Sequence, residues 1–590
     1  MSSKLAIPNK ELPMRTIDSR IWPTKYTLNR LRQELAERLS DLLGASTDQL
    51  FLALEKPKKE EHGQFALPLP QLRLKGNPVQ LAKEVAETFP RDDVFKGASA
   101  VGPFVNFVVD RHHVLRETLK EVLEMKSNFG CNKVGEGRRI MVEYSSPNIA
   151  KPFHAGHLRG TVIGNFLMHL YAANGFETIS MNYLGDWGKQ YGLLAVGFAK
   201  YGSEEELTKD PIKHLFEVYV RINKEMETNP SLDDEARAVF KKMEDGDQEA
   251  LSLWRRFRDL SIAKYKEIYR RLNIEFDIYS GESFFEADML DRIAELREKG
   301  LLVESQGAQV VDLETEGLGK ALILKRDGTT LYITRDIASA QSRFEQFGLD
   351  KCIYVIAMQQ DHHMKQLKAI LSKMQKPWAD EILHVNHGMV LGMKTRKGQV
   401  VFLEDILDDA KDFMHDVMKS NPEKYAQIED PETVADTLAV SAIAIQDMSA
   451  RRIKDYEFKI ERVARFEGDT GPYLQYAHSR ICSIERKSGI DTEAGTIDYS
   501  LLSEKEAVDL AMTIAQYPEI VQEARISLEP CTIVVYLMNL SRQISTVLDR
   551  LWVMGQESEL AKARMALYRA ARYVLGNGLS ILGLEPLERM

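Results

Sequence analysis

Short apolar strands alternate with helices through the middle of this chain, and this alternation limits the possible fold more than any other feature. Helical patterns separate four strand-like segments, which are RIMVEY (139–144), TISMNYL (178–184), KCIYVIAM (351–358) and EILHVNHGMVL (381–391). Strands that alternate with helices favour a parallel sheet with crossover helices. We therefore predict an α/β domain with a parallel sheet over residues 138–404.

Two blocks of different character flank this domain. Residues 1–137 combine a helical pattern at 26–43, an alternating strand at 104–110 and a second helical pattern at 113–125, which predicts a small α/β domain. Residues 405–590 are almost wholly helical by periodicity and predict an all-α domain. A chain of 590 residues suggests three or four domains, because a domain holds roughly 150 residues, and these patterns define three.

Two insertions are expected to interrupt the parallel sheet. Residues 200–270 are charged and helical in pattern, so we predict a helical insertion there. Residues 300–334 contain a hairpin pattern, ALILKRDGTTLYIT, with Asp327 and Gly328 at its turn. On this interpretation a strand ends at Thr334 and Asp336 opens the helix that follows.

Cysteine usage and the N-terminus bear on the cellular compartment. The four cysteines are far apart and no pair has the spacing of metal ligands, which argues against zinc and against a disulfide framework; they are Cys131, Cys352, Cys482 and Cys531. A reducing compartment follows. The first 30 or so residues are mildly basic and acid-poor, which fits either a disordered tail or a mitochondrial transit peptide. We predict a cytoplasmic protein, with a mitochondrial or dual location as the alternative.

The overall charge gives only weak guidance about partners. A formal net charge of −10 taken alone argues against a nucleic-acid partner. Phosphate binding needs only local positive patches, however. Residues 451–465 carry six basic and three acidic side chains, which fits a solvated helix face as well as it fits contact with RNA. No segment approaches the roughly 20 uninterrupted apolar residues of a membrane span.

The segment SSPNIAKPFHAGHLRG, at 145–160, is the strongest single chemical signal. A strand ends near Tyr144 and a helix begins near Gly156, so the segment lies beyond the carboxyl end of a parallel strand, where ligands bind. A helix N-terminus presents free N–H groups to phosphate. Gly156 lets a nucleotide approach the backbone, and His154 and His157 on either side can donate to phosphate oxygens.

HAGH resembles the HIGH motif of class I aminoacyl-tRNA synthetases. Longer strings resemble arginyl-tRNA synthetases in particular, of the eukaryotic or fungal cytosolic type, and they occur in the order of that family over nearly the whole chain. These strings are SSPNIAKPFHAGHLRGTVIGN, YLGDWGKQYG (183–192), YITRDIASA (332–340), YVIAMQQDHH (354–363) and FEGDTGPYLQYAHSR (466–480).

The resemblance implies a fold and an activity. It implies a Rossmann-like catalytic domain, an additional N-terminal domain that binds tRNA, and a helical anticodon-binding bundle. The enzyme would activate L-arginine with ATP and Mg²⁺, release pyrophosphate, and transfer arginine to the 3′ end of tRNA(Arg). It would act as a monomer without zinc or a membrane partner, and tRNA would be needed for activation.

The second half of the class I nucleotide site departs from the family consensus. The counterpart of the KMSKS loop is GMKTRKG (392–398), in which Thr395 stands where the second lysine is expected. By resemblance, Lys151 substitutes as a cation near the phosphates; a solvated loop lysine is the alternative. The implied catalytic residues are His154, Gly156, His157, Lys151, Arg396 and Lys397, and the implied ATP-binding residues are His154, Gly156, His157, Met393, Lys394 and Arg396.

Two acidic residues suit a guanidinium ligand, which needs planar carboxylate partners. Glu143 lies at the end of a strand that is otherwise apolar, where an exposed strand end is the alternative to a site. Asp336 is by local sequence an ordinary helix N-cap. The resemblance places both on the guanidinium and implies a full set for arginine, namely Glu143, Ser146, Asn148, His154, Tyr332, Asp336 and Gln360.

The helical block contains a candidate surface for unpaired bases. Tyr473, Tyr476 and Arg480 lie at i, i+3 and i+7 and share one helix face, where they either stack on bases or belong to a bundle core. The resemblance adds Trp552 and Met590, while Leu548 stands where fungal relatives carry a tyrosine. In the N-terminal block Asn106 and Phe107 are candidate base contacts, or else a strand edge.

Three other functions remain open at this point. The first is an HxGH nucleotidyltransferase that makes a small adenylylated metabolite, although such enzymes are usually shorter and lack a helical RNA-binding block. The second is a tRNA-binding protein without catalysis, which retention of His154, Gly156, His157, Glu143 and Asp336 disfavours. The third is a class I synthetase for another amino acid, which the pair Glu143 and Asp336 disfavours for apolar substrates.

Overall fold

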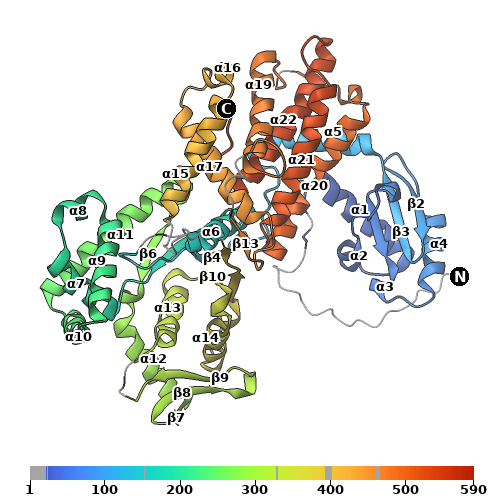
Figure 1. Cartoon of the computed structure of the whole chain (residues 1–590). Helices are drawn as coiled ribbons and strands as arrows, with labels where there is room; N and C mark the ends of the chain where they lie inside the picture. The colour runs from blue at the N-terminus through green and yellow to red at the C-terminus, as the bar shows by residue number, and fades with distance from the viewer. Residues whose placement is uncertain are drawn as a thin grey trace.

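The computed structural model describes residues 21–22, 24–151, 153, 155–326, 328, 330–391, 402–458, 465–493 and 495–590. Several residues singled out above lie outside this part of the chain, and they are His154, Asp327, Met393, Lys394, Thr395, Arg396 and Lys397. Figure 1 shows a central sheet with a helical insertion on one side, a helical bundle above it and the N-terminal domain beyond the bundle.

The N-terminal domain is a small α/β unit, as predicted. Its antiparallel sheet has the order β1-β3-β2, with β1 (Phe65–Pro68), β2 (Phe95–Val101) and β3 (Phe104–Val109). Its last helix starts two residues before the predicted position, because the Asp110 carboxylate accepts hydrogen bonds from the backbone N–H groups of His112 and His113 and caps it. The helices are α1 (Thr27–Leu43), α2 (Thr47–Ala53), α3 (Leu69–Leu72), α4 (Pro78–Thr88) and α5 (Arg111–Met125).

The central sheet is parallel, in the order β11-β10-β4-β5-β6. Its middle strand β4 is buried on both faces and rich in Ile, Met and Val, as strands of covered parallel sheets are. The chain leaves β4 toward β5 and β6 and later returns to form β10 and β11 on the other side, so β4 is a topological switch point, where ligands bind. The strands are β4 (Arg139–Glu143), β5 (Glu177–Leu184), β6 (Ile278–Gly281), β10 (Lys351–Ala357) and β11 (Ile382–His387).

Helices connect and cover these strands (Figure 1). The one that follows β4 is α6 (Ala155–Ala173), and its N-terminus lies beyond the carboxyl end of that strand. The region predicted as a helical insertion is helical, but the helices begin at Lys189 and not near residue 200. They are α7 (Lys189–Tyr201), α8 (Glu204–Lys209), α9 (Pro211–Met226), α10 (Ser231–Glu244) and α11 (Gln248–Arg271).

The second insertion is partly different from the prediction. The first arm of the predicted hairpin is β9 (Gly319–Leu324), but it pairs with β8 (Ala308–Leu313), which pairs in turn with β7 (Leu302–Ser305), and the second arm contributes only the isolated bridge of Thr330 to Leu324. Helix α12 (Glu286–Glu298) precedes this three-stranded antiparallel sheet. The predicted strand through Tyr332–Thr334 is wrong. Leu331 is extended and helix α13 (Tyr332–Phe347) begins directly after it, so Asp336 lies within the second turn of a helix and is not its N-cap.

The segment that precedes residues 392–401 is held by residues 452–457, which follow α17 in the chain. The predicted strand at 381–391 is broken at Gly388, whose N–H donates to the Arg452 carbonyl. After the break, β12 (Val390–Leu391) pairs in parallel with β13 (Tyr456–Glu457). Residues 451–457 are therefore not the helix face considered above; they form a turn and a short strand.

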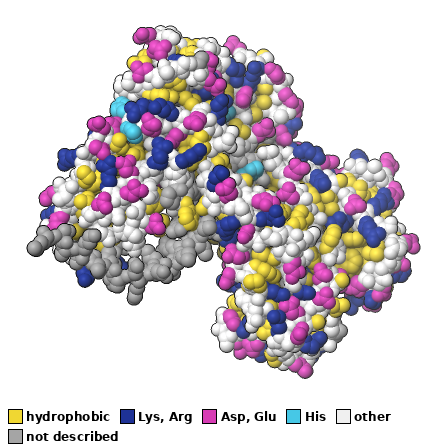
Figure 2. All heavy atoms as spheres, turned by 180° about the vertical axis from the view of Figure 1, so that it is seen from behind, with side chains coloured by type: hydrophobic (Ala, Val, Ile, Leu, Met, Phe, Trp, Pro, Cys, Tyr) yellow, Lys and Arg dark blue, Asp and Glu magenta, His cyan; other side chains and the backbone are white. Residues whose placement is uncertain are grey.

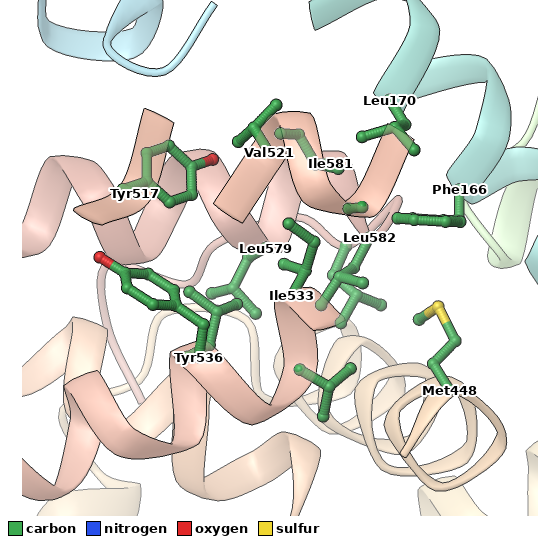
Figure 3. Packing of buried hydrophobic residues seen from close by; sticks show 14 of the residues in the cluster. Phe166, Leu170, Met448, Tyr517, Val521, Ile533, Tyr536, Leu579, Ile581 and Leu582 are labelled. Carbon is green, nitrogen blue, oxygen red and sulfur yellow. The ribbon is translucent and has the colours of Figure 1, made fainter. Parts of the chain in front are cut away.

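The C-terminal domain is a helical bundle, as predicted. Figure 3 shows Phe166 and Leu170 of α6 close to Ile581, Leu582 and Met448, so the catalytic domain and the bundle share one core. The described helices of the bundle are α15 (Leu403–Lys419), α16 (Pro422–Tyr425), α17 (Pro431–Met448), α19 (Gly471–Ser488), α20 (Lys505–Ser527), α21 (Cys531–Arg550) and α22 (Ser558–Ile581). Helix α14 (Asp361–Lys373) belongs to the catalytic domain and packs against its sheet. By length and composition α21 could cross a membrane, but more than half of it is buried between its neighbours α20 and α22.

Close packing of α6 on β4 gives a test of this arrangement. A Cβ added at Gly164 would overlap the Tyr144 ring. We expect Gly164→Ala to lower the free energy of unfolding of the catalytic domain by about 1–3 kcal/mol, the usual cost of overpacking, as measured by urea denaturation. Gly576→Ala on α22 is the matched control, because the atom nearest to its added Cβ would be His478 Nε2 at 3.3 Å. This substitution should change the free energy of unfolding by less than about 1 kcal/mol. Equal effects would contradict the packing.

Candidate functional site

The loop after β4 has a constrained backbone. Ser145, Ser146 and Ala150 have positive φ angles of 71°, 45° and 57°, a region that side chains other than glycine seldom adopt. The Tyr265 hydroxyl holds the loop from α11 by donating to the Asn148 carbonyl (2.8 Å) and the Lys151 carbonyl (2.7 Å). Strain of this kind persists only where surrounding structure enforces it, and it concentrates at functional sites.

Ser146 and Asn148 are fixed against the neighbouring strand β5. The backbone of Asn148 forms a bridge to Gly185, where an added Cβ would overlap the Asn148 amide. The Ser146 hydroxyl accepts from the Tyr183 N–H at 3.3 Å and lies 3.4 Å from the Tyr144 carbonyl oxygen. Both candidate residues therefore lie at the carboxyl edge of the sheet beside Glu143.

The start of α6 places His157 at the same edge. Its imidazole stacks on Phe153, with ring centroids 5.3 Å apart, and Phe153 is itself buried against Tyr265 and Tyr269. Gly156 is exposed. The helix N-terminus is thus accessible, and a half-buried imidazole is held beside it.

Lys151 lies in a turn directly before this helix start. Its ammonium is 5.6 Å from the centroid of the Tyr219 ring on α9, so the helical insertion covers one side of it. Burial lowers the pKa of Lys151. This environment is not that of a freely solvated loop lysine.

Glu143 and Asp336 face a common region. Glu143, only 5% exposed, ends the central strand, and Asp336 lies on α13, which covers that face of the sheet. Burial raises the pKa of Glu143, Arg343 opposes this, and the Asp336 charge adds to the rise. Burial and then the charges of Asp336 and Glu143 also raise the pKa of Tyr183. One phenol therefore lies within electrostatic range of both carboxylates.

Sequence reasoning missed the direct partners of these carboxylates. Arg343, fully buried on α13, forms an ion pair with Glu143 Oε2. His363 Nε2 lies 2.6 Å from Asp336 Oδ2. The only hint of Arg343 was its spacing of seven residues from Asp336, which puts both on one helix face.

Sequence analysis also did not predict a third carboxylate of this region, Glu282. It follows β6 directly and lies 3.4 Å from Arg335, measured from Oε2 to Nη1. Burial, partly opposed by Arg335 and reinforced by Asp186 and Asp336, raises the pKa of Glu282 to about 7. Its position after a strand was the signal available in the sequence.

Tyr332 and Gln360 lie at the rim of the site. Tyr332 is 69% exposed and precedes Asp336 by about one helical turn. Gln360 is exposed in a short 3₁₀ turn after β10. Both are placed where a bound ligand could meet them, and neither is part of the core.

Four candidates for tRNA contact lie close together on the bundle. The Arg480 guanidinium is 5.7 Å from the Tyr476 ring centroid and 3.3 Å from Asp549 Oδ1. Trp552, 66% exposed, donates from Nε1 to the Asp549 carbonyl, and the Tyr473 hydroxyl lies 3.3 Å from Ser545 Oγ. On the face shown in Figure 2, basic and acidic side chains are interspersed, so the net charge does not preclude local basic sites.

The other tRNA candidates are placed less favourably. Phe107 has no exposed surface and packs on Phe89, and Asn106 is 3% exposed, because β3 is the middle strand of its sheet. Neither side chain fits a direct base contact, and the strand-edge alternative is wrong for the same reason. Met590 follows a tail that bonds Gln475 and His478, which face away from Tyr476 on α19.

The arrangement suits a cationic amino acid beside a nucleotide. A helix N-terminus and His157 can receive phosphate at the carboxyl end of β4. Buried Glu143 at the end of the same strand and half-buried Asp336 on α13 can bind a planar cation. Within the described residues no group of three or more His, Cys, Asp or Glu side chains is arranged to hold a metal ion.

Comparison with known proteins agrees with this geometry. Residues 118–460 match the family model of the catalytic domain of "tRNA synthetases class I (R)", residues 474–590 match the DALR anticodon binding domain, and residues 29–109 match the arginyl tRNA synthetase N-terminal domain. A probable cytoplasmic arginine–tRNA ligase of Dictyostelium discoideum is 51% identical, covering 95% of this chain and 100% of the relative. The cytoplasmic arginine–tRNA ligase of Saccharomyces cerevisiae is also 51% identical, covering 96% of each chain.

Solved structures agree at the level of the fold. The arginyl-tRNA synthetase of Thermus thermophilus superposes with a TM-score of 0.81 at 23% identity, covering 95% of this chain and 100% of that one. That of Plasmodium falciparum gives a TM-score of 0.77 at 20% identity, covering 95% and 98%. The chain belongs to the arginyl-tRNA synthetases, class I ligases that activate arginine with ATP and attach it to tRNA(Arg).

Proposed function

We propose that this chain binds the guanidinium of arginine between Glu143 and Asp336 and the phosphates of ATP at the start of α6. The observation that carries this proposal is that Glu143 ends β4 and is tied by Arg343 to α13, the helix that carries Asp336, beside the N-terminus of α6. Ser146, Asn148, Tyr332 and Gln360 border the same region, and we assign them, with His154, to the rest of the amino acid.

Activation is then a displacement at phosphorus. The arginine carboxylate attacks the α-phosphate of ATP, the bond to the β-phosphate breaks, and pyrophosphate leaves. The protein mainly positions the reactants and stabilises charge on the phosphoryl oxygens. We assign this work to the α6 N-terminus, His154, Gly156 and His157. Mg²⁺ arrives with ATP as part of that substrate.

Lys151 supplies the cation that Thr395 does not. It lies directly before the helix start and half-buried beside Tyr219, and an ammonium can act as a point charge from either side of the phosphates. Met393, Lys394, Arg396 and Lys397, in the segment after β12, complete the proposed nucleotide site.

Transfer follows when a terminal ribose hydroxyl of tRNA attacks the activated carbonyl and AMP leaves. We assign Tyr473, Tyr476, Arg480 and Trp552 to the anticodon loop, because exposed Trp552 and the half-buried tyrosines and arginine beside it can stack on unpaired bases. Met590 is also assigned to the anticodon loop.

We further propose a monomer without membrane attachment. We also propose a cytoplasmic location, which the names of the two relatives at 51% identity support; a mitochondrial relative in Saccharomyces cerevisiae, 44% identical, supports the alternative.

The overall activity is tested by charging purified tRNA(Arg) with labelled arginine, alongside ATP–pyrophosphate exchange with and without that tRNA. We expect charging, and exchange that depends on tRNA. Exchange at full rate without tRNA would contradict the proposed dependence and favour a nucleotidyltransferase that acts on small molecules.

His157 is expected to act on phosphate and not on tRNA. His157→Ala should reduce adenylate formation by about 100-fold or more, since it removes a donor to the transition state, while tRNA affinity measured by filter binding changes less than threefold. Loss of both to the same extent would show that the histidine supports the fold.

Glu143 is expected to act on arginine and not on ATP. Glu143→Gln should raise KM for arginine about tenfold or more, because a charge-assisted hydrogen bond is lost, and leave KM for ATP within threefold. The two constants come from pyrophosphate exchange with the other substrate saturating. An unchanged arginine dependence would remove Glu143 from the pocket.

Glu282 predicts a pH dependence. Its pKa is raised to about 7, so it is neutral below that pH and negative above it, where it adds attraction for a cation. KM for arginine should therefore fall by roughly threefold between pH 6 and 8, and Glu282→Gln should flatten this fall. An identical dependence of KM on pH in Glu282→Gln would contradict an effect of the Glu282 charge on arginine binding.

A further inference from the structure

Glu143 is already paired with a guanidinium that belongs to the protein. Arg343 on α13 contacts Glu143 Oε2, and both side chains are buried. We propose that Arg343 is a positioning residue, which holds Glu143 charged and oriented so that its second oxygen is presented to the guanidinium of the substrate. This inference rests on the arginine site proposed above and concerns how that site is kept ready.

The first argument concerns charge. A carboxylate in a dry environment tends to take up a proton, and burial is the main influence on Glu143. The nearby Asp336 works in the same direction, and Arg343 opposes both. Without Arg343, Glu143 would gain a proton more readily and would present a neutral acid to the ligand, a weaker partner for a cation.

The second argument concerns orientation. The Arg343 guanidinium lies 5.0 Å from the ring centroid of Tyr183 and 5.0 Å from that of Tyr354. Tyr183 belongs to β5 and Tyr354 to β10, the two strands that flank β4, and Tyr354 stands directly opposite Glu143 in the sheet. Two rings from neighbouring strands therefore fix the guanidinium above the end of the central strand.

The third argument concerns what remains for a ligand. An ionised carboxylate has two oxygens and about four acceptor positions. Arg343 contacts Oε2, so we assign the other oxygen, Oε1, to a second planar cation. Asp336, seven residues before Arg343 on α13, supplies the other carboxylate. The position of the Arg343 guanidinium thus determines where the guanidinium of the substrate can bind.

Chemical rescue tests this inference. Arg343→Ala should raise KM for arginine about tenfold or more and change KM for ATP less than threefold. Guanidinium chloride at low millimolar concentration should then lower KM for arginine in Arg343→Ala, because free guanidinium fills the vacated place. In the unmodified enzyme it should raise KM, because it only competes with arginine. Urea has the same shape without charge and should rescue nothing. A rise of KM with guanidinium in both proteins would overturn the inference.

Two further variants test the inference even if Arg343→Ala does not fold. Arg343→Lys keeps the charge but not the planar stack between the tyrosines, so KM for arginine should rise at least fivefold with KM for ATP unchanged. Arg525→Lys, a buried arginine on α20 outside the site, is the matched control and should change neither. An unchanged KM for arginine in Arg343→Lys, with folding verified by circular dichroism, would also overturn the inference.

Glu143→Gln in the same assays separates this inference from the proposed site. If Glu143→Gln leaves KM for arginine unchanged, the site assignment fails. If Glu143→Gln raises it and Arg343→Ala does not, only the positioning role fails. The double variant should be no worse than Glu143→Gln alone, because residues that act through one another are not additive.

Discussion

The site depends on one buried ion pair at the end of the central strand. Removing a carboxylate from water is costly unless a charged, well-oriented partner compensates. Arg343 provides that partner for Glu143, and the strands on both sides of β4 contribute the aromatic rings that hold it. The sheet, α13 and the site are therefore interdependent: a shift of α13 would alter the charge and direction of the side chain that we assign to arginine.

The same principle recurs where the catalytic domain meets the bundle. Arg159, buried on α6, donates to the Lys454 carbonyl at 2.6 Å and lies 3.8 Å from the buried Asp447 carboxylate of α17. Its guanidinium is 5.2 Å from the Tyr456 ring centroid on β13, the strand that pairs with β12. Helix α6, whose start we assign to the nucleotide, is thus joined to the segment leading to residues 392–401 and to α17 of the bundle.

Much of this architecture could be predicted from local patterns. The strands at 139–144 and 178–184 and the helix between them follow from their apolar content and from the break at 145–154, and the structure confirms them. The helical character of the insertion and of the bundle was equally evident, since helical periodicity is a local property. The resemblance of the longer strings to the family then predicted Glu143 and Asp336 as a pair that binds arginine.

The remaining features depend on contacts distant in sequence. Nothing near Tyr332 shows that a helix starts there, because Leu331 provides no side-chain cap and the first turn is instead bound to β9, where the Thr334 hydroxyl donates to the Ile323 carbonyl. The burial of Phe107 follows from its place in the middle strand of a sheet, which strand periodicity does not reveal. Arg343 was overlooked because an arginine in an amphipathic helix is usually solvated, and only the fold places it over Glu143.

The most direct test is a crystal structure of the protein with arginine bound. The account predicts that the guanidinium nitrogens of the ligand lie about 2.7–3.2 Å from carboxylate oxygens of both Glu143 and Asp336, with Arg343 still on Glu143 Oε2. A ligand guanidinium bound elsewhere, or one that displaces Arg343 from Glu143, would contradict it.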